Sequence, residues 1–114
     1  MLNTGLKHLE ERKQIDELLK DNENVIICCG RMGPMCIPVY DIVQNLESEY
    51  PHVQMRDMDF DIPPASYIRN LPECALFTGL PFTIYSKNDR VVKATSGIRD
   101  ENQIRIISDD IFKG

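Results

Sequence analysis

The fold of this chain is determined by one stretch, Val25-Ile26-Ile27-Cys28-Cys29-Gly30-Arg31-Met32-Gly33-Pro34-Met35-Cys36. Residues 25–29 form a continuous apolar run rich in β-branched side chains, as expected of a strand that is buried on both faces of a sheet. Residues 30–34 contain two glycines and a proline and predict a loop. Cys36 then lies near the start of a predicted helix, residues 35–50, whose apolar side chains recur every three or four positions. The stretch therefore predicts a buried strand, a loop and a helix in succession.

Strands and helices alternate on both sides of this stretch. The last two strands are joined by Lys87-Asn88-Asp89, which has hairpin chemistry because Asn and Asp tolerate a positive φ. The earlier strands are separated by helices, which requires parallel pairing with helical crossovers. The order predicts an α/β fold, with a mixed central sheet of four or five strands and helices on both faces. The predicted strands are residues 6–9, 25–29, 53–58, 82–86 and 90–96, and the predicted helices are residues 10–21, 35–50, 63–70 and one that Asp100 and Gln103 cap at its start.

Length and charge restrict the function further. A chain of 114 residues has the length of one domain, residues 1–114. It carries 13 basic and 18 acidic residues, a net charge of −5, which argues against nucleic acid or an anionic membrane surface as a partner. Residues 1–10 lack the apolar core of a signal peptide, and no apolar run approaches the length of a membrane span. We therefore expect a cytoplasmic protein whose four cysteines are thiols and not a structural disulfide framework.

Four local features, taken in order, resemble the thioredoxin family over roughly residues 6–112. The buried strand leads through Gly33-Pro34 into a long helix, and residues 53–61 form a strand that ends in acidic residues. Residues 78–83, Thr-Gly-Leu-Pro-Phe-Thr, are similar to the Gly-Ile-Pro-Thr segment of the family, and residues 87–90 are similar to its hairpin turn. The resemblance implies a thioredoxin-like fold, a cis bond between Leu80 and Pro81, and a substrate-binding edge formed by Gly33, Pro34, Leu80 and Pro81.

The same resemblance identifies the chain as an atypical member. The active site of the family is Trp-Cys-Gly-Pro-Cys, whereas residues 31–36 here read Arg-Met-Gly-Pro-Met-Cys, and the chain contains neither a Cys-x-x-Cys pattern nor a tryptophan. The buried aspartate that assists proton transfer in the family falls on or near Ile27. The family's mechanism therefore does not transfer residue by residue.

The four cysteines are the candidate chemical groups. Cys36 lies at the start of a helix, where free backbone N–H groups and the helix dipole favour the nucleophilic thiolate. Cys28 and Cys29 end the buried strand and point to opposite faces, and we expect Cys29 to lie near the loop and to pair with Cys36. Cys74 is a possible third thiol. The alternative interpretation is that these residues are core cysteines, or in the case of Cys74 a partly exposed cysteine, without a chemical role.

Two other sequence patterns do not indicate a metal-binding site. Asp57, Asp59 and Asp61 alternate at the end of a predicted strand, but isoleucine stands at the positions where a calcium loop needs Gly and Glu. We interpret these aspartates as a solvated strand end. His8 and His52 lie far apart in the sequence, and neither has a helical partner for metal ligation.

These observations leave two hypotheses. The first is a thiol–disulfide oxidoreductase with a non-standard site, which acts on protein disulfides, receives electrons from a thioredoxin-reductase-type donor, needs no bound cofactor and works as a monomer in cell redox homeostasis. The second is a non-catalytic thioredoxin-fold module that holds an extended peptide at the loop of residues 32–35 and at Leu80-Pro81.

Overall fold

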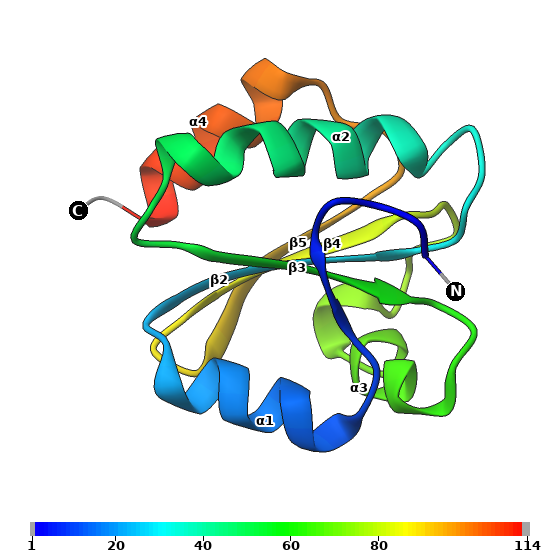
Figure 1. Ribbon diagram of the computed structural model, residues 1–114. Helices are drawn as coiled ribbons and strands as arrows, with labels where there is room; N and C mark the ends of the chain where they lie inside the picture. Colours follow the sequence, from blue (N-terminus) through cyan, green and yellow to red (C-terminus); the bar gives the residue numbers. More distant parts are fainter. Residues whose placement is uncertain (1, 113–114) are drawn as a thin grey trace.

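A computed structural model describes residues 2–112 and shows a five-stranded sheet between two layers of helices (Figure 1). Helices α2 and α4 cover one face of the sheet, which we call the α2 face, and α1 and α3 cover the other, which we call the α1 face (Figure 1). The elements are β1 (Lys7–Leu9), α1 (Arg12–Asp21), β2 (Asn24–Gly30), α2 (Ile37–Leu46), β3 (Gln54–Asp59), α3 (Ser66–Arg69), β4 (Phe82–Lys87), β5 (Arg90–Ser96) and α4 (Glu101–Ile111), with short 3₁₀ turns at Glu47–Glu49, Pro63–Ala65 and Pro72–Cys74.

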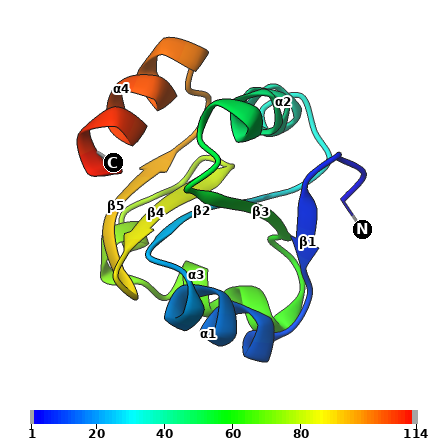
Figure 2. The ribbon, with the colours of Figure 1, turned by 60° about the vertical axis from the view of Figure 1, so that its left-hand side comes forward.

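The strand order is β1-β3-β2-β4-β5, with β1 and β5 at the two edges (Figure 2). Strands β1 and β2 run parallel to β3, whereas β4 pairs antiparallel with both β2 and β5. All seven residues of β2 are buried, because this strand has a neighbour on each side and helices on each face. The predicted mixed sheet with helices on both faces is confirmed.

Local sequence signals explain where the elements begin and end. Asp100 accepts a hydrogen bond from the Gln103 N–H at 2.8 Å in the predicted capping box of α4. Asn88 and Asp89 have φ values of 54° and 64°, as the hairpin prediction requires. The helix predicted over residues 35–50 is shorter in the structure and gives way to a 3₁₀ turn after Leu46, consistent with the following Pro51, which disfavours helical geometry in the residue before it.

Alternation along β2 divides the core in two. Ile26 and Cys28 belong to the buried cluster beneath α2 and α4, together with Cys36. Ile27 and Cys29 belong to the cluster on the α1 face. Adjacent residues of a strand point to opposite faces, and the two neighbouring cysteines therefore lie in different environments.

Within residues 2–112, none of the helices combines the length and the apolar composition that crossing a membrane requires.

Candidate thiol site

A row of polar side chains crosses the α2 face of the sheet from one edge to the other. The register places His8 of β1 opposite Asp57 of β3, and Asp57 opposite Cys28 of β2. Cys28 in turn lies opposite Thr83 of β4, and Thr83 lies opposite Thr95 of β5. We call these five residues the polar row. Directly opposed residues project from the same face of a sheet, so the row brings a thiol and a carboxyl group together beneath α2.

Cys36 lies on the same face, at the end of β2. It is the N-cap residue of α2, and its Sγ accepts a hydrogen bond from the backbone N–H of Arg31 at 3.4 Å. A Cβ atom placed on Gly30 would lie only 2.7 Å from this sulfur, so Cys36 rests directly on the backbone at the end of β2. Only 3 % of Cys36 is exposed. Its sulfur therefore contacts the backbone N–H of Arg31 while being shielded from solvent.

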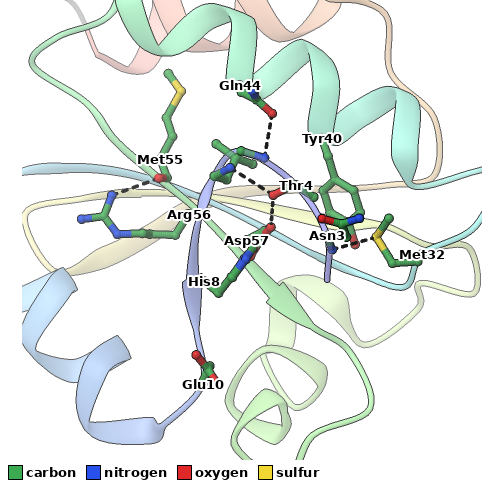
Figure 3. Close-up of polar contacts among 12 residues, drawn as sticks. Asn3, Thr4, His8, Glu10, Met32, Tyr40, Gln44, Met55, Arg56 and Asp57 are labelled. Atoms are coloured by element: carbon green, nitrogen blue, oxygen red, sulfur yellow. Dashed lines mark hydrogen bonds and ion pairs between the residues drawn. The ribbon is translucent and has the colours of Figure 1, made fainter. Parts of the chain in front are cut away.

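Tyr40, one turn further along α2, closes the same space. Figure 3 shows its side chain reaching from α2 towards the sheet. Its hydroxyl donates a hydrogen bond to the backbone oxygen of Arg31 at 3.2 Å and would lie 2.7 Å from a Cβ atom on Gly30. Burial raises the pKa of Tyr40 well above its usual value, and the neighbouring Cys28 and Cys36 raise it further. Tyr40 therefore acts as a neutral donor that fixes the loop after β2.

Cys28 is fully buried between strands β3 and β4. The hydroxyl of Thr83 donates to its sulfur at 3.7 Å. Burial raises the pKa of Cys28 far above its usual range, and the neighbouring Cys29, Cys36 and Asp57 add to the effect, whereas the Thr83 hydrogen bond opposes it. At neutral pH this residue is accordingly a protonated thiol.

The other two cysteines lie on the α1 face. Cys29 and Cys74 share the buried cluster of that face. The prediction that Cys29 is the strand cysteine facing the loop and helix start is wrong, because Gly30, on which Cys36 rests, is two residues from Cys28 and hence on the Cys28 side of the strand. Burial is the first cause that raises the pKa of Cys29 to about 12 and that of Cys74 to about 11. All four cysteines are free thiols.

Asp57 is the residue that the sequence interpretation missed. It was expected at a solvated strand end, but none of its surface is exposed. One carboxyl oxygen accepts from the Thr4 hydroxyl at 2.5 Å, and the other lies 2.6 Å from Nδ1 of His8 (Figure 3). Burial raises the pKa of Asp57, and the bonds from Thr4 and His8 counteract part of that rise. Strand alternation could have indicated this burial, because Asp57 follows the buried Met55 by two residues and therefore lies on the same face of β3.

The predicted cis bond between Leu80 and Pro81 is present. A Cβ atom on Gly30 would lie 3.0 Å from Cβ of Pro81, which places this proline beside the sulfur of Cys36. Met32 and Met35 in the adjoining loop are 43 % and 52 % exposed. The loop, the proline and the helix start therefore meet at one place on the surface.

Arg31 anchors the loop from outside. Its guanidinium group makes two hydrogen bonds of 2.8 Å to the carboxyl group of Asp61 and lies over the ring of Phe60, 5.4 Å from its centre. The same residue donates its N–H to Cys36 and accepts from Tyr40 through its backbone. The side-chain ion pair thus holds the peptide unit that contacts the sulfur.

A metal centre is not formed by the part of the chain that the structure describes, since no group of three or more His, Cys, Asp and Glu residues in it is arranged to hold an ion.

Neither a family model nor a curated protein matches this sequence. Solved structures do match its fold. Oxidised thioredoxin O2 from Arabidopsis thaliana matches with a TM-score of 0.75 and 12% identity, over 97% of each chain. Thioredoxin from Plasmodium falciparum matches with a TM-score of 0.74 and 20% identity, over 90% of this chain and 97% of that one. Oxidised mitochondrial thioredoxin 3 from Saccharomyces cerevisiae matches with a TM-score of 0.72 and 20% identity, over 96% and 95%. The chain has the thioredoxin fold.

Proposed function

We propose that this protein is a thiol–disulfide oxidoreductase in which Cys36 attacks a disulfide of a protein substrate and Cys28 resolves the mixed disulfide. One observation carries the proposal: the sulfur of Cys36 rests on Gly30, accepts the N–H of Arg31 and belongs to the same buried cluster as Cys28. The pair replaces a Cys-x-x-Cys site with one thiol from the central strand and one from the helix start.

Electropositive groups lie beside the sulfur of Cys36. The sulfur of Cys36 lies at the positive end of the α2 dipole, accepts the backbone N–H of Arg31 and interacts electrostatically with the Arg31 guanidinium group. Because only 3 % of Cys36 is exposed, a protein disulfide reaches it only when the loop of residues 31–35 moves aside. A Cβ atom on Gly33 would meet nothing within 4 Å, so the space beside this part of the loop is open.

The proposed reaction has two exchanges. The Cys36 thiolate attacks one sulfur of the substrate disulfide, which forms a mixed disulfide and releases the first substrate thiolate. Cys28 then loses its proton and attacks the Cys36 sulfur, which releases the second substrate thiolate and leaves a Cys28–Cys36 disulfide. Two electrons pass from the protein dithiol to the substrate, and a thioredoxin-reductase-type donor returns them. The exposed Met32 and Met35, with Gly33, Pro34 and the backbone at Leu80-Pro81, would hold the substrate segment.

The test is thiol chemistry on the intact chain. Competitive alkylation should label Cys36 first among the four thiols, and Cys36→Ser should abolish disulfide reduction, whereas Cys74→Ser should retain it. Peptide mapping of oxidised protein should find Cys28 bonded to Cys36. A Cys29–Cys36 bond, the pairing expected from the sequence, would keep the activity but assign a different resolving thiol. If the parent reduces no disulfide, the proposal fails.

The burial of Cys36 supports a second candidate function, an interaction module without turnover. Met32 and Met35 are exposed beside a thiol that is 3 % exposed, which suits apolar contact with a peptide better than immediate attack. In that case a chain with all four cysteines replaced should bind extended peptides from a random library as tightly as the parent, and the parent should show no disulfide reduction.

A further inference from the structure

Thr95, at the β5 end of the polar row, is the member of the row whose side chain has no hydrogen-bond partner. His8 contacts Asp57, and the hydroxyl of Thr83 donates to Cys28. Thr95 is only 6 % exposed, and its buried Oγ1 atom makes no hydrogen bond to any of residues 2–112. Leaving a buried hydroxyl unpaired is costly, so its place calls for an explanation beyond packing.

A groove beside Thr95 offers that explanation. It lies between the edge strand β5 and helix α4, which covers this end of the sheet (Figure 2). Its volume is about 290 Å³. Two cationic, two polar and two apolar side chains line the groove: Lys93 and Thr95 from β5, Arg99 from the following loop, and Gln103, Ile106 and Ile107 from α4. The lining suits a ligand that has a negative charge and an apolar part.

The two cations of the groove are not neutralised by the protein itself. Within residues 2–112, neither Lys93 nor Arg99 has a carboxyl group at ion-pair distance. The acidic residues that follow Arg99 in the chain are engaged elsewhere, since Asp100 caps the start of α4 and Glu101 pairs with Arg105 at 3.6 Å. The groove therefore keeps its positive charge.

The charge of Arg99 reaches the interior beneath α4. Burial raises the pKa of Tyr85, Cys28 adds to that rise, and Arg99 opposes it. Tyr85 lies opposite Lys93 in the sheet register, and its buried hydroxyl also has no partner in the described part of the chain. Arg99 uses one N–H for a backbone carbonyl, at 2.9 Å, and its other donors remain available. The guanidinium group thus acts on the same part of the sheet as the unpaired hydroxyls.

Gln103 contributes a donor whose orientation is fixed. Its Oε1 atom accepts the backbone N–H of Asp100 at 2.9 Å in the capping box of α4. Because this oxygen is used, the amide nitrogen Nε2 is the group that Gln103 can offer to a ligand. The Asp100 carboxyl group occupies the N–H of Gln103, so the donors of the groove are side chains and not the free end of a helix.

The number and charge of these donors distinguish between two kinds of anion. A carboxylate has one negative charge and two oxygens. The phosphoryl group of a monoester has a charge of about −1.5 to −2 at pH 7 and three strong acceptor oxygens. Two cations, a hydroxyl and an amide therefore match a phosphoryl group better than a carboxylate.

We propose that the groove between β5 and α4 binds a phosphate monoester. Arg99 and Lys93 neutralise its charge, the Nε2 group of Gln103 donates to it, and the hydroxyl of Thr95 turns about χ1 to donate to a third oxygen. The two isoleucines of α4 contact the carbon group that carries the phosphate. The groove contains no cysteine, so the proposal does not depend on the proposed thiol chemistry.

The first experiment is a titration of the intact chain with phenyl phosphate, followed by NMR in a buffer of low salt without phosphate. Saturable shifts are expected at the backbone amides of Thr95, Arg99 and Gln103. Benzoate should bind about tenfold more weakly because it has one charge and two oxygens, and inorganic phosphate about threefold more weakly because it lacks the apolar group. Shifts that do not saturate, or benzoate binding as tight as that of phenyl phosphate, would overturn the proposal.

The second experiment measures the same affinity in variants of the two cations. Arg99→Gln should weaken phenyl phosphate binding by about tenfold, and Lys93→Gln, at an exposed position, by about threefold. Arg90, at the other end of β5 and outside the lining of the groove, is the matched control. Arg90→Gln should bind as the parent does. Equal losses in the Arg90 and Arg99 variants would show that net charge alone attracts the anion, and would overturn the proposal.

The third experiment tests the unpaired hydroxyl. Thr95→Val keeps the shape of the side chain and removes its oxygen. Affinity for phenyl phosphate should fall by about three- to tenfold, while the free energy of unfolding should not fall, because the hydroxyl has no partner in the described part of the fold. Lower stability with parent-like affinity would show that the hydroxyl serves the fold, and would overturn its assignment to the groove.

A final comparison identifies the source of the phosphoryl group. Phosphotyrosine that is capped by peptide bonds on both sides is titrated beside phenyl phosphate. Tighter binding of the capped residue would support a phosphorylated protein side chain as the ligand, and equal binding would support a free monoester. Binding of neither compound at the groove would overturn the proposal, and the thiol reaction of Cys36 would remain to be judged by its own test.

Discussion

Cys28 and Cys29 are neighbours in the chain but differ in almost every property that governs a thiol. Cys28 shares the α2 face with Cys36, Asp57 and the Thr83 hydroxyl. Cys29 lies on the α1 face, among apolar side chains of which Phe82, Ile84 and Met58 are examples, with Cys74 as the other thiol of that cluster. The sheet thus separates a thiol that has a hydroxyl, a carboxyl group and a second thiol beside it from one that packs among apolar side chains, with Arg69 and Asp59 as its charged neighbours.

The difference shows how the two faces of one sheet can place neighbouring cysteines in different chemical environments. Alternation assigns each residue of β2 to one face, and the register then decides which polar groups of β1, β3 and β4 stand beside it. The α2 face collects a carboxyl group, an imidazole and two hydroxyls in the polar row, whereas the cysteines of the α1 face lie in a cluster of mainly apolar side chains.

The largest effect is expected at Gly30, where the thiol site is most crowded. A Cβ atom there would lie 2.7 Å from both the Cys36 sulfur and the Tyr40 hydroxyl. Gly30→Ala should therefore destabilise the fold by about 1–3 kcal/mol through overpacking and should change the rate of Cys36 alkylation. Denaturant unfolding and mass-resolved alkylation measure the two effects.

Gly33→Ala is the matched control, because an added Cβ would meet nothing within 4 Å. It should leave stability near that of the parent. Equal stability of both alanine variants would show that the sulfur of Cys36 does not rest on Gly30.

The second prediction compares the two neighbouring cysteines directly. In Cys29→Ser a hydroxyl replaces a sulfur among apolar side chains, and burying a hydroxyl without a partner costs about 1–3 kcal/mol. In Cys28→Ser the hydroxyl of Thr83 lies next to the new group. We therefore expect Cys29→Ser to lower the free energy of unfolding more than Cys28→Ser does, as read from chemical denaturation. The reverse order would contradict the contrast between the faces.

Much of the fold could be predicted because its signals are local. The apolar run of β2, the Asn88-Asp89 turn and the Asp100–Gln103 capping box each depend on residues close in sequence. The candidate site was harder because it depends on pairing between distant strands. Spacing alone did not show which strand cysteine faces α2.

Asp57 illustrates the same limit. It belongs to an alternating run of aspartates, a pattern typical of a solvated strand end, and its burial depends on Thr4 and His8, about fifty residues away in the chain. Only the register of β1 against β3 brings these residues together. The period of β3 predicted the face of Asp57, but no local pattern predicted its partners.

The third prediction compares two aspartates whose pKa values shift in opposite directions. Burial raises the pKa of Asp57, so its contribution to stability is complete below the ordinary aspartate pKa of about 3.9 and is lost as pH rises through the folded-state pKa. The hydrogen bond from Arg31 lowers the pKa of Asp61, so its contribution is present above that ordinary value and is lost as pH falls through the folded-state pKa.

Unfolding free energies measured from acid to neutral pH test these signs. The free energy of unfolding of Asp57→Asn, minus that of the parent, should increase as pH rises. The reason is that only the parent loses stability when this buried carboxyl group ionises. The difference for Asp61→Asn should change in the opposite direction and by less, since Asp61 is exposed and solvent screens its ion pair. Slopes of the same sign would contradict the assignment of one buried and one exposed carboxyl group.

The smallest effect is expected at Arg31, whose ion pair with Asp61 leaves more than half of both side chains exposed. Arg31→Gln removes the positive charge near Cys36 and should slow its alkylation by about two- to fivefold at low salt, with a smaller difference at high salt because exposed charges are screened. Arg12 offers a matched control on the α1 side: it forms an ion pair of 3.1 Å with Asp16 and lies 4.7 Å from the ring centre of Tyr67. Arg12→Gln should leave Cys36 alkylation unchanged, and an equal loss in both variants would mean that net charge, and not the position of Arg31, controls the thiol.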